Sequence, residues 1–110
     1  MKSRWLNLTA AAALTLGASQ VMAADMPPLA ASSGCTACHA IDKKVVGPSW
    51  ADVAKKYKGD ASAKGHLVDK VKAGGKGNWT EVTGGVPMPP YSPRVSDADI
   101  ATLVDFILGL

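Results

Sequence analysis

The stretch Cys35-Thr36-Ala37-Cys38-His39 contains both cysteines and one of the two histidines of this 110-residue chain. Two thiols three residues apart can lie on one side of a helical turn, and an imidazole follows them directly. Residues of these types can hold a zinc ion, form a redox-active disulfide or anchor a covalently attached cofactor. The rest of the sequence must discriminate among these three chemistries.

Zinc has little support in the sequence. A structural zinc site uses four ligands, usually arranged as two pairs. Outside the Cys-x-x-Cys-His stretch, the chain has no further cysteine and one further histidine, His66. A second ligand pair is therefore missing.

A thiol–disulfide oxidoreductase would also use Cys-x-x-Cys, and an oxidising compartment would suit it. That motif is expected beside a β-α-β pattern, whereas the apolar periodicity of this chain is helical throughout. Such an enzyme also has no need of a histidine directly after the second cysteine. We retain this reading as a remote alternative.

The third chemistry explains the whole motif, because Cys-x-x-Cys-His is the attachment sequence of c-type haem. The thiols of Cys35 and Cys38 can add across the two vinyl groups of one porphyrin and form thioethers. His39 then falls beneath the iron and supplies an imidazole nitrogen. A small domain with few aromatic residues also needs a covalent aid to its stability. The sequence predicts one covalently bound haem c.

A six-coordinate iron needs a second axial ligand, for which the main candidates are Met88 and His66. Met88 lies within the sequence Val-Pro-Met-Pro-Pro, where prolines on both sides restrict the backbone. Met26 is too close in sequence to the cysteines to reach the other face of the haem. We favour Met88 over His66, which lies in a predicted helix.

The N-terminus has the features of a secretory signal peptide. A basic start precedes a short apolar run, and Val21-Met22-Ala23 is an A-x-A-like cleavage sequence. We predict a signal peptide at residues 1–23 and a single domain at residues 24–110, in the periplasm and without stable membrane insertion. Removal of Lys2 and Arg4 lowers the formal net charge from +3 to +1. Nucleic-acid binding has no support.

The predicted elements are about four short helices and no strands. The first spans Leu29–Ala37, and the second follows an N-cap at Ser49 and ends by Gly59. The third carries Ala63, Leu67, Val68 and Val71 and is closed by Gly74-Gly75. The fourth is capped by Ser96 and has an apolar face at Ile100, Leu103, Val104 and Ile107. Residues 74–95 form a long loop without periodicity, which we expect to be ordered.

Together, CTACH, Gly47-Pro48, the PMPP around Met88 and the helix after VSDAD resemble a small bacterial monohaem class I cytochrome c, of the c-551/c-552 type. The resemblance covers essentially all of residues 24–110 and implies the all-α class I cytochrome c fold. It also implies that the Pro48 carbonyl orients His39, and that Trp79 and Lys70 lie near a haem propionate. The sequence departs from the family pattern in three places. The stretch from Trp79 to Met88 is longer, Tyr91-Ser92-Pro93 follows PMPP where many members carry an asparagine that supports the methionine sulfur, and Ala30 replaces a common phenylalanine.

The resemblance implies a soluble periplasmic one-electron carrier. It also implies the partners, a quinol-oxidising complex upstream and a terminal oxidase or nitrite reductase downstream. Filled axial positions at His39 and Met88 predict no enzyme activity. Lys43 and Lys44 would ring the haem edge where partners dock, and we expect a monomer. The alternative is a haem-based sensor or a peroxidase-like protein with an open iron position.

Overall fold

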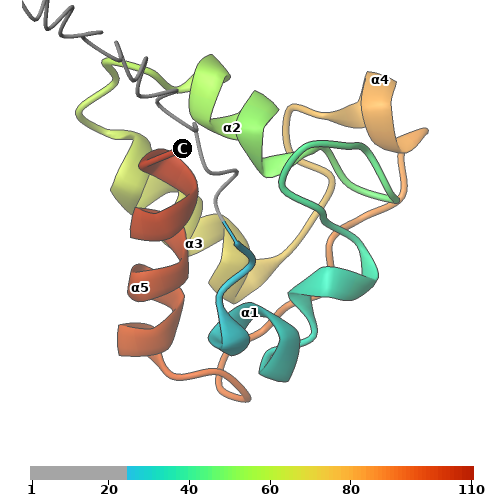
Figure 1. Cartoon of the computed structure of the whole chain (residues 1–110). Coiled ribbons are helices and arrows are strands. Elements are labelled where there is room, and N and C mark those ends of the chain that lie inside the picture. Colours follow the sequence, from blue (N-terminus) through green and yellow to red (C-terminus); the bar gives the residue numbers. More distant parts are fainter. Residues whose placement is uncertain (1–24) are drawn as a thin grey trace, which may run out of the picture.

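A computed structural model describes residues 25–110, so the predicted signal peptide at residues 1–23 lies outside the described residues. The described chain is helical (Figure 1). Its elements are α1 (Pro28–Ser32), the 3₁₀-helix η1 (Cys35–Ala37), α2 (Trp50–Lys56), α3 (Ala63–Ala73), α4 (Thr80–Thr83) and α5 (Asp97–Leu108). Within these residues the β-type pairing consists of two isolated antiparallel bridges, His39 with Lys44 and Gly75 with Met88. The prediction of an all-α fold is confirmed.

Two of the predicted boundaries are wrong. The single helix expected over Leu29–Ala37 is two elements, because Gly34 between them has a φ of 84°. This left-handed conformation ends a right-handed helix and is easily adopted by glycine alone. The break separates α1 from the cysteine-bearing turn, so the two can take different directions.

The second error concerns the loop predicted over residues 74–95. It contains a helix of its own, α4, whose four residues Thr80–Thr83 lie between Trp79 and Gly84. Four residues are about one helical turn, which is too short to show an apolar period. This helical turn lies in the stretch between Trp79 and Met88, which is longer than in the common members of the family that the sequence resembles.

The predicted N-caps are confirmed. The Ser49 hydroxyl accepts a hydrogen bond from the Asp52 N–H at 3.1 Å, and the Ser96 hydroxyl accepts one from the Asp99 N–H at 3.2 Å. Each bond satisfies a donor that the first helical turn leaves unpaired. These caps fix where α2 and α5 begin, and the cap of α2 stands directly after Pro48.

The core lies along α5, which contacts α1, α2 and α3. In Figure 1, α5 runs beside α3, with α1 near one end and α2 near the other. Ala30 is fully buried and belongs to the same apolar cluster as Leu103 and Ile107, so a small side chain serves the contact of α1 with α5. A second cluster contains Tyr91, Val95, Ile100 and Val104.

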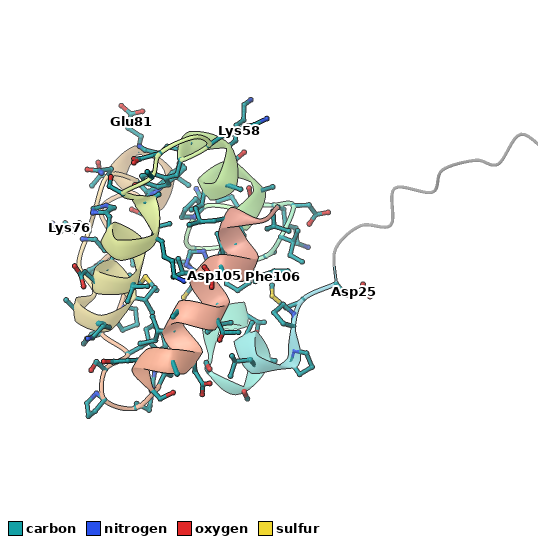
Figure 2. The ribbon with its side chains drawn as sticks, turned by 90° about the vertical axis from the view of Figure 1, so that its left-hand side faces the viewer. Asp25, Lys58, Lys76, Glu81, Asp105 and Phe106 are labelled. Carbon is teal, nitrogen blue, oxygen red and sulfur yellow. The ribbon has the colours of Figure 1, made fainter. Side chains whose placement is uncertain are left out.

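An ion pair between Lys64 and Asp105, at 3.0 Å, joins α3 to α5 on the outer surface. Figure 2 labels Asp105 beside Phe106, whose ring meets Trp50 of α2 edge to face at 6.0 Å. Both charged side chains are exposed, so the ion pair contributes little to stability.

Within residues 25–110, no helix combines the length and apolarity needed to cross a bilayer.

Candidate functional site

One cavity gathers all seven predicted site residues. It lies between the segment 35–50, α3, the loop 75–91 and α5, and its volume is about 1170 Å³ with the open mouth included. Its inner wall is largely apolar and includes Val53, Leu67, Leu103 and Ile107. The seven predicted residues on it are Cys35, Cys38, His39, Pro48, Lys70, Trp79 and Met88. A cavity with this apolar lining suits a large apolar cofactor.

The cysteine turn is held by its own backbone. The N–H groups of Cys38 and His39 both donate to the Cys35 carbonyl, at 3.2 and 3.0 Å. Both cysteines are free thiols, Cys35 buried and Cys38 half-buried. Burial raises the pKa of the Cys35 thiol, so this sulfur stays protonated at neutral pH. The turn therefore presents two thiols and the adjacent imidazole to one cavity.

His39 is fixed by three neighbours on the segment that follows it. Its Nδ1 lies 2.9 Å from the Pro48 carbonyl oxygen. Because that oxygen can only accept, Nδ1 carries the proton and Nε2 is left with a free lone pair. The ring of Trp50 lies 5.9 Å from the imidazole, between centroids. A Cβ at Gly47 would lie 2.5 Å from His39 Cε1, so only glycine allows this approach.

The protonation state of His39 agrees with a role as a ligand. Burial lowers the pKa of the imidazole, and the hydrogen bond to Pro48 offsets part of that shift. The native environment thus favours the neutral ring, which is the form that binds a metal ion.

Met88 is held by two backbone hydrogen bonds to Gly75. The Met88 N–H donates to the Gly75 carbonyl at 3.0 Å, and the Gly75 N–H donates to the Met88 carbonyl at 2.9 Å. Further along, the Tyr91 N–H donates to the Val71 carbonyl at 3.1 Å. The segment that carries Met88 is therefore fastened to the C-terminal end of α3 and its side chain enters the cavity from there.

Trp79 and Lys70 lie at the mouth of the cavity and are partly exposed. The Lys56 ammonium of α2 lies 4.8 Å from the centre of a Trp79 ring, a cation–π contact that joins α2 to the α4 segment. His66, the rival ligand candidate, is exposed at the mouth with its ring 6.0 Å from that of Tyr57. His66 has no backbone pairing comparable to that of Met88 beyond the helix it belongs to.

Comparison with known proteins decides the family. The family model for cytochrome c matches residues 18–110. The chain belongs to the cytochrome c family. Its relatives are electron-transfer proteins, so it is an electron carrier and not an enzyme, and its cofactor is one covalently bound haem c.

Individual relatives of this cytochrome c agree. The chain is 56% identical over 82 residues to cytochrome c-551 of Allochromatium vinosum, covering 74% of this chain and 82% of that protein. It is 43% identical over 110 residues to cytochrome c-552 of Nitrosomonas europaea, covering 100% and 99%. The crystal structure of Nitrosomonas europaea cytochrome c552 matches with a TM-score of 0.67 at 45% identity, covering 74% of this chain and 95% of that chain. The class I fold is thereby confirmed.

The residues around the cavity fit haem c. Two free thiols on one turn can form both thioethers, and His39 offers an unprotonated Nε2 beside them. The largely apolar wall suits a porphyrin, and the mouth carries Lys70 and the Trp79 indole where carboxylates would need partners. The described residues that line this cavity fall between Cys35 and Ile107.

Four further residues of this site were not predicted from sequence. Gly47 and Gly74 act through the space they leave free, and Trp50 and Tyr91 line the cavity. From the sequence, Gly74 is predicted only as the end of the third helix. The sequence did carry one signal, since a glycine directly before Pro48 indicates a close backbone approach.

Proposed function

We propose that this cytochrome c is a periplasmic one-electron carrier whose iron is bound by His39 and Met88. The observation that supports it is their position, since both line one cavity from separate segments that are each fixed by hydrogen bonds. Cys35 and Cys38 hold the haem through thioethers. When bound, the haem supplies an Fe(III)/Fe(II) couple that takes up and releases one electron.

His39 and Met88 would fill both axial positions of the iron. The imidazole is oriented by the Pro48 carbonyl, which accepts from Nδ1 and thereby makes Nε2 a stronger donor. A thioether paired with an imidazole gives a higher reduction potential than two imidazoles. With both positions occupied, no site is left for a substrate, which agrees with a carrier.

The cavity wall would keep water away from the iron of a bound haem. Val53, Leu103, Val104 and Ile107 form an apolar surface, and the last three belong to the buried face of α5. A dry surrounding disfavours the added charge of the oxidised iron and so also raises the potential. At the mouth, the Trp79 indole and the Lys70 ammonium would partner a haem propionate.

Partners would dock transiently at the rim of the mouth. Val46 and Val86 line the cavity yet are 39% and 50% exposed, which gives the rim an apolar centre. Lys43 and Lys44 are exposed on the segment just before Val46, and Figure 2 shows Lys76 at the outer edge of the molecule. Such a surface suits short-lived contact with an acidic partner. A quinol-oxidising complex upstream and a terminal oxidase or nitrite reductase downstream are the proposed partners of a monomer.

Export by a signal peptide at residues 1–23 would place the domain in the periplasm, where c-type haem is attached. N-terminal sequencing of the protein isolated from the periplasm tests this point. A mature chain that starts near Ala24 is the expected result, and retention of residues 1–23 in the membrane fraction would contradict it.

The absorption spectrum of the oxidised holoprotein tests the ligand pair. The weak charge-transfer band of an Fe(III)–thioether bond should be present in the wild type and absent from Met88→Ala. Met26→Ala is the matched control, since Met26 is not among the residues that line the cavity. A high-spin wild-type ferric protein without the band would instead favour the open-iron sensor or peroxidase-like function. A band that survives in Met88→Ala would exclude Met88 as its source.

A further inference from the structure

The loop between Gly75 and Met88 is closed at its base, but its tip has no hydrogen bond to the rest of the described chain. Gly75 and Met88 exchange two backbone hydrogen bonds, at 2.9 and 3.0 Å. Between them, every hydrogen bond that residues 76–87 make within the described chain stays inside that segment. The position of the loop tip therefore depends on side-chain contacts.

The short helix at this tip, α4, has no partner helix among residues 25–110. Figure 1 shows it apart from α3 and α5, and in Figure 2 its residue Glu81 lies at the same end of the molecule as Lys58, which follows α2. No residue of α4 is buried. Because four residues do not form a stable helix alone in water, α4 needs support from the residues beside it.

Trp79, the residue directly before α4, provides part of that support. It is half-buried, lines the cavity and packs against the apolar cluster that contains Val53 and Leu103. The backbone before it also passes the Lys70 side chain, since a Cβ at Gly77 would lie 3.5 Å from Lys70 Cε. The indole is thus the part of the loop tip that reaches the core.

Lys56 contacts Trp79 from outside the cavity. Its ammonium lies 4.8 Å from the centre of a Trp79 ring, whereas Lys56 itself does not line the cavity. Neither of the ion pairs formed within residues 25–110 involves Lys56. The aromatic ring is therefore a favourable partner for this cation, for which no carboxylate competes.

We propose that Lys56 is a positioning residue that holds the Trp79 indole, and with it the tip of the loop, over the mouth of the haem cavity. Lys56 ends α2, which packs against α5 and begins at the Ser49 cap, so it extends from a well-supported helix. For its effect on the potential, the inference rests on the proposed role of Trp79 at a haem propionate. An indole that stays in place keeps its N–H beside the propionate and keeps water from the haem edge.

Loss of the Lys56 cation would have two measurable effects. The loop tip would open more often, which exposes the N–H groups of Val82 and Thr83 that donate to the Trp79 carbonyl at 2.9 Å. Water would also reach the haem more readily, and a wetter surrounding lowers the midpoint potential. The lost charge lowers the potential as well, but salt screens that effect and does not screen the access of water.

The test compares Lys56→Met with Lys56→Arg and Lys55→Met in the haem-loaded protein. Methionine keeps most of the lysine stem and a similar helix propensity but has no charge. Arginine keeps the charge and also binds aromatic faces. Lys55 is the adjacent exposed lysine in the last turn of α2 and lies outside the cavity lining, so it controls for the loss of one charge.

Hydrogen exchange followed by NMR of the reduced protein measures the opening of the loop. Lys56→Met should speed exchange of the Val82 and Thr83 amides about two- to fivefold, the effect of one exposed cation–π contact. The Ile100 amide, bonded to Ser96 at the start of α5, should exchange as before. At high salt, the midpoint potential of Lys56→Met should still lie below that of the wild type. The other two variants should match the wild type in both measurements.

Unchanged amide exchange in Lys56→Met, or an equal acceleration in Lys55→Met, would overturn the proposal. A double-mutant cycle gives a second criterion, because Lys56→Met should have no further effect in a Trp79→Leu background. An undiminished effect in that background would show that Lys56 acts on another group. Rapid exchange of the Trp79 indole proton in the wild type would count against the propionate contact alone, since the two amides still report on Lys56.

Discussion

Gly74 lies directly against the backbone of Met88. A Cβ at Gly74 would approach the Met88 carbonyl oxygen to 2.5 Å and the Pro90 nitrogen to 2.8 Å. The same glycine has a φ of 71°, which side chains rarely adopt. The end of α3 and the position of the proposed iron ligand are therefore determined by one residue without a side chain.

We predict that Gly74→Ala displaces the Met88 segment. The variant should lose about 1–3 kcal/mol of stability through backbone strain alone, with the close contact adding to it. The ferric charge-transfer band should weaken as well. Denaturant unfolding and the ferric spectrum measure both effects.

The control for that variant is Gly84→Ala. Gly84 also has a positive φ, 66°, but a Cβ there would meet nothing within 4 Å. It should be destabilised by strain while its spectrum stays that of the wild type. Equal spectral changes in both variants would show that the contact with Met88 is unimportant.

Gly47→Ala should disturb His39 from the other side of the site. The new methyl group would overlap the imidazole, so the ring must leave its position beside the Pro48 carbonyl. We expect a loss of about 1–3 kcal/mol from overpacking, together with a changed midpoint potential. Voltammetry and denaturant unfolding of the holoprotein check this prediction.

Gly65→Ala makes the matching comparison, because Gly65 lies in α3 and a Cβ there meets nothing within 4 Å. Alanine in a helix should stabilise that variant by up to about 1 kcal/mol, with no change in potential. A wild-type potential in Gly47→Ala would mean that the His39 ring can shift without consequence for the iron.

The cap at Ser49 links the stability of α2 to the haem site. Ser49 is buried between Pro48, which orients His39, and Trp50, which packs beside it. Ser49→Ala should cost about 1 kcal/mol through loss of the cap bond and should also shift the midpoint potential. Thermal unfolding and voltammetry give the two values.

Ser96→Ala removes an equivalent cap from α5 at an exposed position remote from the cavity lining. Its stability should fall by a similar amount while its potential is unchanged. Should both variants shift the potential alike, the effect would come from general loosening and not from the neighbours of His39.

Removal of the haem should unfold the chain. Leu103, Val104 and Ile107 of α5 face the cavity that the haem would occupy, and without the haem this apolar wall is open to water. Cys35→Ala and Cys38→Ala, produced in a haem-attaching host, should yield a largely unfolded chain, because cofactor binding stabilises only the folded state. Circular dichroism measures the helix content.

Thr36→Ala changes an exposed residue between the two cysteines and should retain both the haem and the helices. Full native helicity in the cysteine variants without bound haem would show that the fold is independent of its cofactor.

The periodic elements of this fold could be read from the sequence, and the aperiodic ones could not. Ser49 and Ser96 each precede an acidic residue by three positions and an apolar face, and both caps are present. The break at Gly34 and the short α4 depend on local backbone geometry that leaves no repeat in the sequence. A glycine can end a helix or lie within a turn, so its presence in the sequence does not distinguish these two structures.

The residues of the candidate site also divide into those that the sequence predicts and those that it does not. Side chains with distinctive chemistry, such as Cys35, Cys38, His39 and Met88, could be singled out because few residues of their types exist in the chain. The contributions of Gly47 and Gly74 depend on distances of 2.5 Å to atoms many residues away.

The two segments that carry His39 and Met88 are separated by on the order of fifty residues, so a metal bonded to both would close a large ring of chain. Such a closure acts as a cross-link and restricts the unfolded ensemble much as a disulfide does. Unlike a disulfide, this link has a strength that depends on the oxidation state of the iron. Folding stability and reduction potential then become one thermodynamic cycle, in which the reduced protein resists unfolding more strongly whenever Fe(II) holds the sulfur more tightly than Fe(III) does.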